Sequence, residues 1–190
     1  MHALNKSFVS CAAAFVLTGC LVSETPLLDA SNGRARPIDP GDYQSCSYSD
    51  GELDGECSNL RVSMDDTRLY RMVDDDKEVL LVRFRKFARS AYLAQTIGED
   101  ELDDDEGYMY FLARPENGGL GMTMLLCPDL PENLKSDLVE SGEMEIESDG
   151  EVCVARTLNA ALAGAKAYNR ESAPPARMRL VFTAVADMKE

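Results

Sequence analysis

The segment VLLVRFRKFARSAYLAQTI, residues 79–97, decides the fold of this 190-residue chain. It holds two runs of β-branched, aromatic and long apolar residues, 79–87 and 91–97, separated by Arg89 and Ser90. Runs of this length and composition favour strands, and a short polar break between them favours a turn. The segment therefore predicts two neighbouring antiparallel strands.

Further runs of the same kind lie on both sides of this pair. The acidic turn 74–76 precedes it, and the Gly-containing loop 115–119 separates two later runs. Asp, Asn and Gly supply the backbone conformations that tight turns need. We expect additional strands at residues 69–73, 108–113, 120–126, 144–146, 152–155 and 178–185. Regular spacing with turn chemistry predicts an antiparallel meander.

Two segments near the C-terminus have helical periodicity. Residues 131–139 form a short helix candidate, and 157–168 form an amphipathic one that Thr157 caps. Pro174 and Pro175 break the chain before the last expected strand. We therefore expect an α+β fold: an antiparallel β-meander, as a curved or small barrel-like sheet, with one or two helices near the C-terminus.

The first twenty residues predict where the protein is located. An apolar run at 8–17 follows a single cation, Lys6, and is too short to cross a bilayer as a helix. It closes on the motif LTGC at 17–20, which resembles the lipobox of bacterial lipoproteins. The resemblance implies that lipid is attached to the Cys20 thiol, that the signal peptide 1–19 is removed, and that the new amino group is acylated. An ordinary secretory signal with an unrelated cysteine is the alternative.

The residues after the motif refine this prediction. Leu21, rather than Asp, follows the cysteine, and the same resemblance then implies forwarding to the outer membrane. Several acyl chains, at ~0.8 kcal/mol per buried methylene, form a practically permanent anchor. The proline-containing stretch 20–41 predicts a flexible tether, with an arm packed over the sheet from Ile38 onward as the alternative. We expect residues 42–190 to form a single globular domain.

Charge narrows the choice of partners. The chain has 34 Asp and Glu residues against 19 Lys and Arg residues, a net charge of −15. Nucleic acid is not an expected partner, because binding to phosphates requires clustered cations. The same charge disfavours adhesion to anionic lipid headgroups, so the lipid anchor is the expected contact with the membrane.

The composition also argues against catalysis. The only histidine is His2, which lies in the expected signal peptide. The mature chain would then lack Ser-His-Asp and Cys-His relays and histidine metal sites, while its carboxylates are too numerous to specify one catalytic pair. Acidic runs at 74–76 and 99–106 lack the spacing of a calcium-binding EF-hand loop and predict solvated turns. We expect a non-catalytic protein with no cofactor and no metal.

Four cysteines remain for the mature domain: Cys46, Cys57, Cys127 and Cys153. An even number in an oxidising compartment predicts two disulfides. Of the three pairings, local order favours Cys46 with Cys57 and Cys127 with Cys153, because each pair closes a short loop that contains a turn. Asp-Gly pairs at 50–51 and 54–55 are hairpin signals inside the first loop. Zinc bound by four thiolates is the alternative, although the chain has no C-x-x-C pair.

One strand of the expected sheet carries a basic cluster. Arg83 and Arg85 alternate with apolar residues and so share a face, with Lys86 and Arg89 close behind. The planar guanidinium group of arginine binds anions through paired donors, so this face is a candidate binding site for a lipid phosphate, a cell-wall carboxylate or an acidic partner. Pairing with carboxylates on neighbouring strands is the alternative.

Two strands carry candidate apolar binding residues. Met122 and Met124 share one face of the run 120–126, and Tyr108 and Tyr110 share a face of the run before it. If the sheet closes, one such face lines the interior, where methionine adapts to varied small apolar ligands. Plain core packing is the alternative.

These observations lead to one functional prediction and one alternative. We expect a non-catalytic bacterial envelope lipoprotein that is anchored in the outer membrane, faces the periplasm and binds an envelope protein or supports an assembly. The alternative is a carrier of a small molecule or lipid, with an apolar interior in a lipocalin-like layout. That comparison rests on the meander alone, because the chain has no lipocalin motif.

Overall fold

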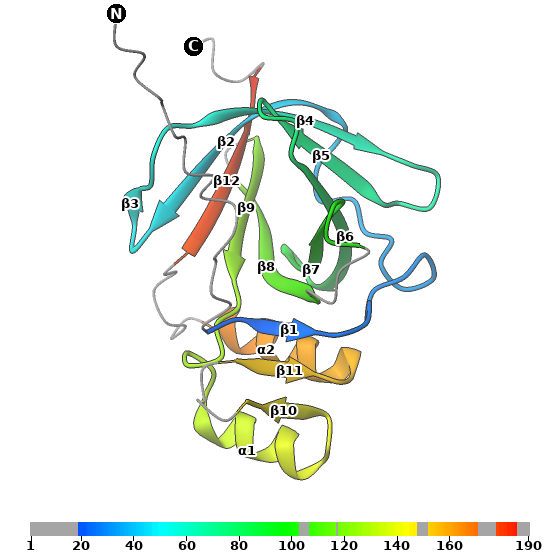
Figure 1. Ribbon diagram of the computed structural model, residues 1–190, viewed down its shortest axis with the longest axis vertical. Helices are drawn as coiled ribbons and strands as arrows, with labels where there is room; N and C mark the ends of the chain where they lie inside the picture. Colours follow the sequence, from blue (N-terminus) through cyan, green and yellow to red (C-terminus); the bar gives the residue numbers. More distant parts are fainter. Residues whose placement is uncertain (1–18, 103–106, 117, 148–151, 171–177, 186–190) are drawn as a thin grey trace, which may run out of the picture.

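The computed structural model describes residues 19–102, 107–116, 118–147, 152–170 and 178–185. The predicted cleavable signal lies almost entirely outside these residues. The described chain forms a β-barrel with a smaller unit of three short strands and two helices stacked against one end (Figure 1).

Within the described residues, eight antiparallel strands close the barrel. They are β2 (Gly41–Ser49), β4 (Ser58–Met64), β5 (Tyr70–Asp74), β6 (Val79–Ala88), β7 (Ala91–Gly98), β8 (Tyr108–Glu116), β9 (Gly119–Met124) and β12 (Met178–Ala184). Each strand pairs with the next one in this order, and β12 pairs with β2 to complete the circle. The short strand β3 (Glu52–Leu53) pairs with β2 beside the barrel. The predicted antiparallel, barrel-like sheet is thus confirmed.

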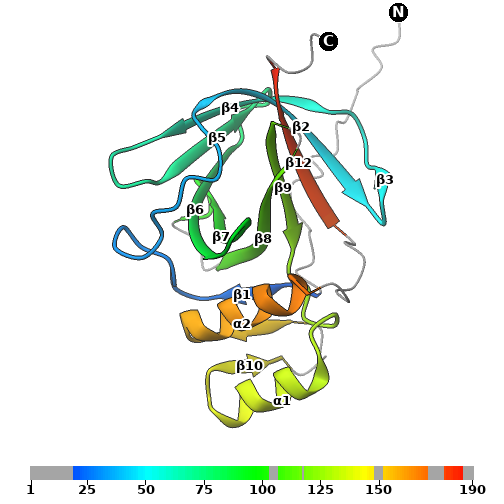
Figure 2. The same ribbon diagram turned by 180° about the vertical axis from the view of Figure 1, so that it is seen from behind.

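A side sheet leaves the barrel wall at β8. Strand β1 (Leu21–Ser23) pairs antiparallel with the start of β8 and parallel with β11 (Cys153–Ala155), which pairs with β10 (Met144–Ile146). The two helices are α1 (Glu132–Glu140) and α2 (Leu158–Tyr168). From behind, α2 lies across the side sheet and α1 lies beside β10 (Figure 2).

Strand alternation fills the barrel interior with apolar side chains. Val82 and Phe84 point inward from β6, and the Phe84 ring meets the Tyr70 ring edge-on at a centroid distance of 5.2 Å. Leu120 and Met122 of β9 are fully buried in the same cluster. Edge-to-face aromatic pairs and burial of this kind stabilise the closed sheet.

The opposite faces of β7 and β8 pack under α2. Leu93 and Leu112 are buried there against a helix rich in alanine. Small residues let the helix approach closely: a Cβ added at Gly164 would lie 3.0 Å from the Leu21 side chain. The Thr157 hydroxyl accepts a hydrogen bond from the Ala160 N–H and caps α2, as its sequence predicts.

Both predicted disulfides are present in the structure. Cys46 is bonded to Cys57, which joins β2 to the chain entering β4. Cys127 is bonded to Cys153, which joins the chain leaving β9 to β11. The pairing by local order is therefore confirmed.

The stretch that we expected to be a flexible tether differs from that expectation. Leu21, Leu28 and Ile38 are all buried, and Ala35 donates a backbone hydrogen bond to Phe84 of β6. Prolines prevent this stretch from forming a long regular strand, but they do not prevent spaced apolar side chains from docking on the barrel. We call residues 24–35 the arm.

Candidate partner-binding pocket

A pocket of about 260 Å³ lies between the arm and the outer face of β6 and β7. We call it the outer pocket. It is lined by Pro26, Leu28, Asp29, Ala30, Leu69, Leu81, Arg83, Gln95, Ile97, Leu102 and Tyr108. The arm forms one wall and the barrel forms the floor.

The floor follows from strand register. Leu81 lies opposite Ile97, and Arg83 lies opposite Gln95, on the face of the sheet that points away from the barrel interior. Leu81 is half-buried and Leu102, at the rim, is 48% exposed. The pocket therefore offers water-accessible apolar surface on a highly acidic protein.

A buried polar network holds the arm against this floor. The Leu28 N–H donates to Gln95 Oε1 at 2.7 Å, and Gln95 Nε2 donates to the Leu28 carbonyl at 3.2 Å. The Tyr110 hydroxyl donates to Gln95 Oε1 at 3.2 Å and lies 2.6 Å from the Ser23 hydroxyl. Burial raises the pKa of Tyr110 far above its ordinary value, so the hydroxyl stays protonated. These bonds satisfy polar groups that would otherwise be buried without partners.

The predicted basic cluster is divided among several contacts. Arg83 donates to the carbonyl and hydroxyl oxygens of Thr67 at 2.9 and 3.2 Å, and Arg85 donates to the Asn32 carbonyl at 3.4 Å. Both arginines thus support loops on the outer face of the barrel. Lys86 lies 5.9 Å from the centre of the Tyr92 ring. Arg89 is exposed in the turn between β6 and β7.

Two carboxylates stand beside Arg83. Hydrogen bonds from the Ser31 hydroxyl and N–H and from the Asn32 N–H, with a smaller effect of Arg83, hold the pKa of Asp29 below its ordinary value. At Asp65, partial burial raises the pKa, but bonds from Leu69 N–H and Thr67, together with Arg83, outweigh it and lower the pKa overall. Both groups are therefore anionic at neutral pH.

The two predicted apolar pairs lie on opposite faces of the closed sheet, with the methionine pair on the interior face. Met122 belongs to the barrel core, and Met124 lies at its edge. Tyr110 is buried in the cluster under α2, and Tyr108 lines the outer pocket. The register of β8 and β9 places Met122 opposite Ala113 and Met124 opposite Phe111, so Tyr108 and Tyr110 point to the other face of the sheet.

Cys20 is buried at the start of the side sheet. Its side chain is 7% exposed and its Sγ lies 3.4 Å from Met124 Sδ. Burial raises the pKa of this thiol. Cys20 also forms an isolated antiparallel bridge with Leu126.

Sequence reasoning named Arg83 and Tyr108 but missed Gln95 and Leu28. The available signal was the amide side chain at position 95 in the largely apolar run 91–97, because a buried amide requires polar partners. The identity of those partners depends on where the arm docks, which local patterns do not encode.

In the described part of the chain, no group of three or more His, Cys, Asp or Glu residues is placed to hold a metal ion. Over the same residues, no helix is both long enough and apolar enough to cross a membrane. Comparison with protein-family models, curated proteins and solved structures finds no match.

Proposed function

We propose that this chain is a non-catalytic bacterial envelope lipoprotein. Lipid on Cys20 anchors it in the outer membrane, and the barrel faces the periplasm and binds an envelope protein. The motif LTGC at 17–20 supports the anchor. The two disulfides support an oxidising compartment, since such bonds persist outside the cytosol.

The outer pocket is the observation that favours protein binding. Its lining includes accessible apolar side chains at Leu81 and Leu102, whereas the barrel interior is occupied by buried side chains such as Tyr70 and Phe84. The occupant proposed is an apolar side chain on a basic segment of the partner. An apolar side chain in a pocket provides the anchoring contact of many protein interfaces.

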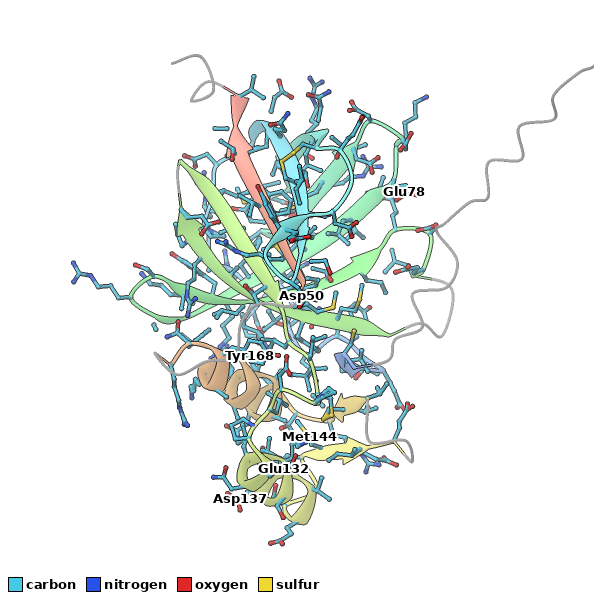
Figure 3. All side chains as sticks on the ribbon, turned by 90° about the vertical axis from the view of Figure 1, so that its left-hand side faces the viewer. Asp50, Glu78, Glu132, Asp137, Met144 and Tyr168 are labelled. Carbon is cyan, nitrogen blue, oxygen red and sulfur yellow. A yellow bond between two sulfur atoms is a disulfide. The ribbon has the colours of Figure 1, made fainter. Side chains whose placement is uncertain are left out.

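The negative charge of the protein is the reason for proposing that the bound segment of the partner is basic. Arg83 and Asp29 both line the pocket, so their charges offset each other. Two further carboxylates lie next to the lining: Asp65 accepts a hydrogen bond from the lining residue Leu69, and Glu101 precedes the exposed Leu102. The acidic character extends over the molecule: Glu78 projects from the barrel, while Glu132 and Asp137 lie on α1 at the opposite end (Figure 3). A field of this sign speeds encounter with cationic partners and rejects anionic ones.

Site-specific photocrosslinking in the native envelope tests the pocket. We expect a photoreactive residue at Leu102 to give one discrete protein adduct, and Leu81→Asp to abolish it. Leu53 provides the matched control, because it is 52% exposed, against 48% for Leu102, and lies on β3. Adducts of equal yield and size from both positions, or an adduct unaffected by Leu81→Asp, would contradict binding at the outer pocket.

Fractionation tests the anchor separately. The wild-type chain is expected in the outer-membrane fraction, and Cys20→Ser is expected to leave it, because the serine hydroxyl does not receive the thioether-linked lipid. A Cys20→Ser variant that remains in the outer membrane would refute the anchor without bearing on the pocket.

A further inference from the structure

The residues next to the proposed cleavage point are held by both halves of one disulfide. The Cys127 N–H donates to the Gly19 carbonyl, and the Cys153 N–H donates to the Cys20 carbonyl at 3.1 Å. Cys127 and Cys153 are themselves bonded to each other. The chain around Cys20 therefore lies between two segments that are covalently joined.

The following residues are fixed just as firmly. The Leu21 N–H donates to the Leu125 carbonyl at 2.8 Å, and Leu21 is fully buried against α2. Val22 is paired with Met109 on one side and Val154 on the other. Regular sheet structure thus begins one residue after Cys20, with β1 enclosed between β8 and β11.

From this we infer, on the basis of the proposed lipidation, that the anchor has no spacer. The lipid at Cys20 holds the β1 end of the molecule directly against the bilayer. The Cys127–Cys153 disulfide clamps β1 in its place in the fold. Cleavage before Cys20 removes the Gly19 carbonyl but keeps the bonds of Cys20 to Cys153 and of Leu21 to Leu125. Attachment of the lipid requires the Cys20 Sγ to leave its contact with Met124 Sδ, while the backbone bonds of Cys20 and Leu21 stay in place.

The clamping of β1 by the Cys127–Cys153 disulfide follows from which segments flank this strand. At Cys20 and Leu21 the neighbours are the chain after β9 on one side and β11 on the other, and the disulfide prevents these two neighbours from separating. Val22 and Ser23 follow directly and pair with β8. Without it, β11 depends on short three-residue strand pairings, which open at low free energy. The Cys46–Cys57 disulfide joins β2 to β4 instead and supplies a matched control.

Amide hydrogen exchange on the full-length protein, purified from membranes and placed in lipid nanodiscs, tests the inference. Intact mass first establishes whether lipid is present on Cys20. The inference predicts protected amides at Leu21–Ser23 in the lipidated protein. Cys127→Ser/Cys153→Ser should accelerate their exchange by about tenfold or more, whereas Cys46→Ser/Cys57→Ser should leave it unchanged.

The outcomes separate the two proposals. Lipid on Cys20 with freely exchanging amides at 21–23 would overturn the spacer-free anchor and leave the lipoprotein proposal standing. Lipid with protected amides that are insensitive to loss of Cys127–Cys153 would overturn the clamp. Absence of lipid would overturn both proposals. If the first double variant does not fold, reduction of folded Cys46→Ser/Cys57→Ser opens the same bond, with β6 amides reporting barrel integrity.

Discussion

At the residue scale, Gln95 determines how the arm meets the barrel. Its amide forms two hydrogen bonds with the Leu28 backbone, and its carbonyl oxygen also receives the Tyr110 hydroxyl. Gln95 is 4% exposed, so these bonds form in a water-poor environment where an unpaired amide is costly. One side chain thus specifies the wall of the outer pocket.

Removal of the Tyr110 hydroxyl should weaken this arrangement. Tyr110→Phe deletes the bonds to Ser23 and Gln95 while keeping the ring in the cluster under α2. We expect the free energy of unfolding to fall by about 1–2 kcal/mol in urea denaturation. Tyr92→Phe is the control, because its ring stays available to Lys86, and it should change stability by less than about 0.5 kcal/mol. Equal effects of the two variants would contradict the role of the network.

The arm should also respond to acid through Asp29. Its folded-state pKa lies below the ordinary value of 3.8, because it accepts bonds from Ser31 and Asn32. The unfolded chain therefore takes up the proton first, so this contribution is present above pH 3.8 and is lost as the pH falls through the lower folded-state pKa. The protection of the Ser31 and Asn32 amides, measured as the exchange rate relative to an unstructured chain at the same pH, should fall over that window in the wild type. Asp29→Asn should not show this acid-induced step, and a step of equal size would count against the explanation.

At the element scale, strands and helices were predicted well where their sequences carry a strong apolar pattern. The strands around residues 79–97 were predicted nearly to their ends, and so was α2, because their patterns are strong. β2 and β4 were represented only by turn signals between them. The sequence of β2 mixes polar residues on both faces, whereas β4 alternates Leu60, Val62 and Met64 with polar residues, a period-two pattern that was available but overlooked. β1 was missed because three residues beside an expected signal carry no period.

Closure of the barrel depends on a glycine at the start of β9. A Cβ added at Gly119 would lie 1.7 Å from the Phe182 carbonyl oxygen, so β9 and β12 meet only if this position lacks a side chain. Gly119→Ala should destabilise the fold by about 3 kcal/mol or more. Gly41→Ala is the matched control, because its Cβ would make an ordinary contact at 3.7 Å with Tyr43. This variant should lower the free energy of unfolding by less than about 1 kcal/mol. Thermal denaturation of both variants measures the difference; similar melting temperatures would contradict this view of closure.

At the scale of the whole molecule, the candidate site is formed by tertiary contacts between segments that are distant in sequence. Arg83 and Tyr108 were singled out from separate strands, yet neither pattern located the pocket. The arm residues that form its wall, at 26–30, lie more than fifty positions away in sequence from Arg83. The disulfides were predictable for the opposite reason. Each closes a local loop, and short loops bring their ends together at low entropic cost.

The disulfides should contribute much of the net stability. They join residues 11 and 26 positions apart, for which loop entropy gives roughly 3 kcal/mol each. We expect Cys46→Ser/Cys57→Ser to lower the free energy of unfolding by about that amount while the barrel stays folded. Adding reductant to the wild type should lower it further, because both bonds are then lost. A double variant as stable as the oxidised wild type would contradict this expectation.

The most direct measurement for the account as a whole is the intact mass of the full-length protein extracted from bacterial membranes under non-reducing conditions. The lipoprotein proposal predicts a chain that begins at Cys20, carries a diacylglyceryl group and an amide-linked acyl chain, and contains two disulfides. A mass that retains residues 1–19, or one cleaved without any lipid, would contradict the central claim.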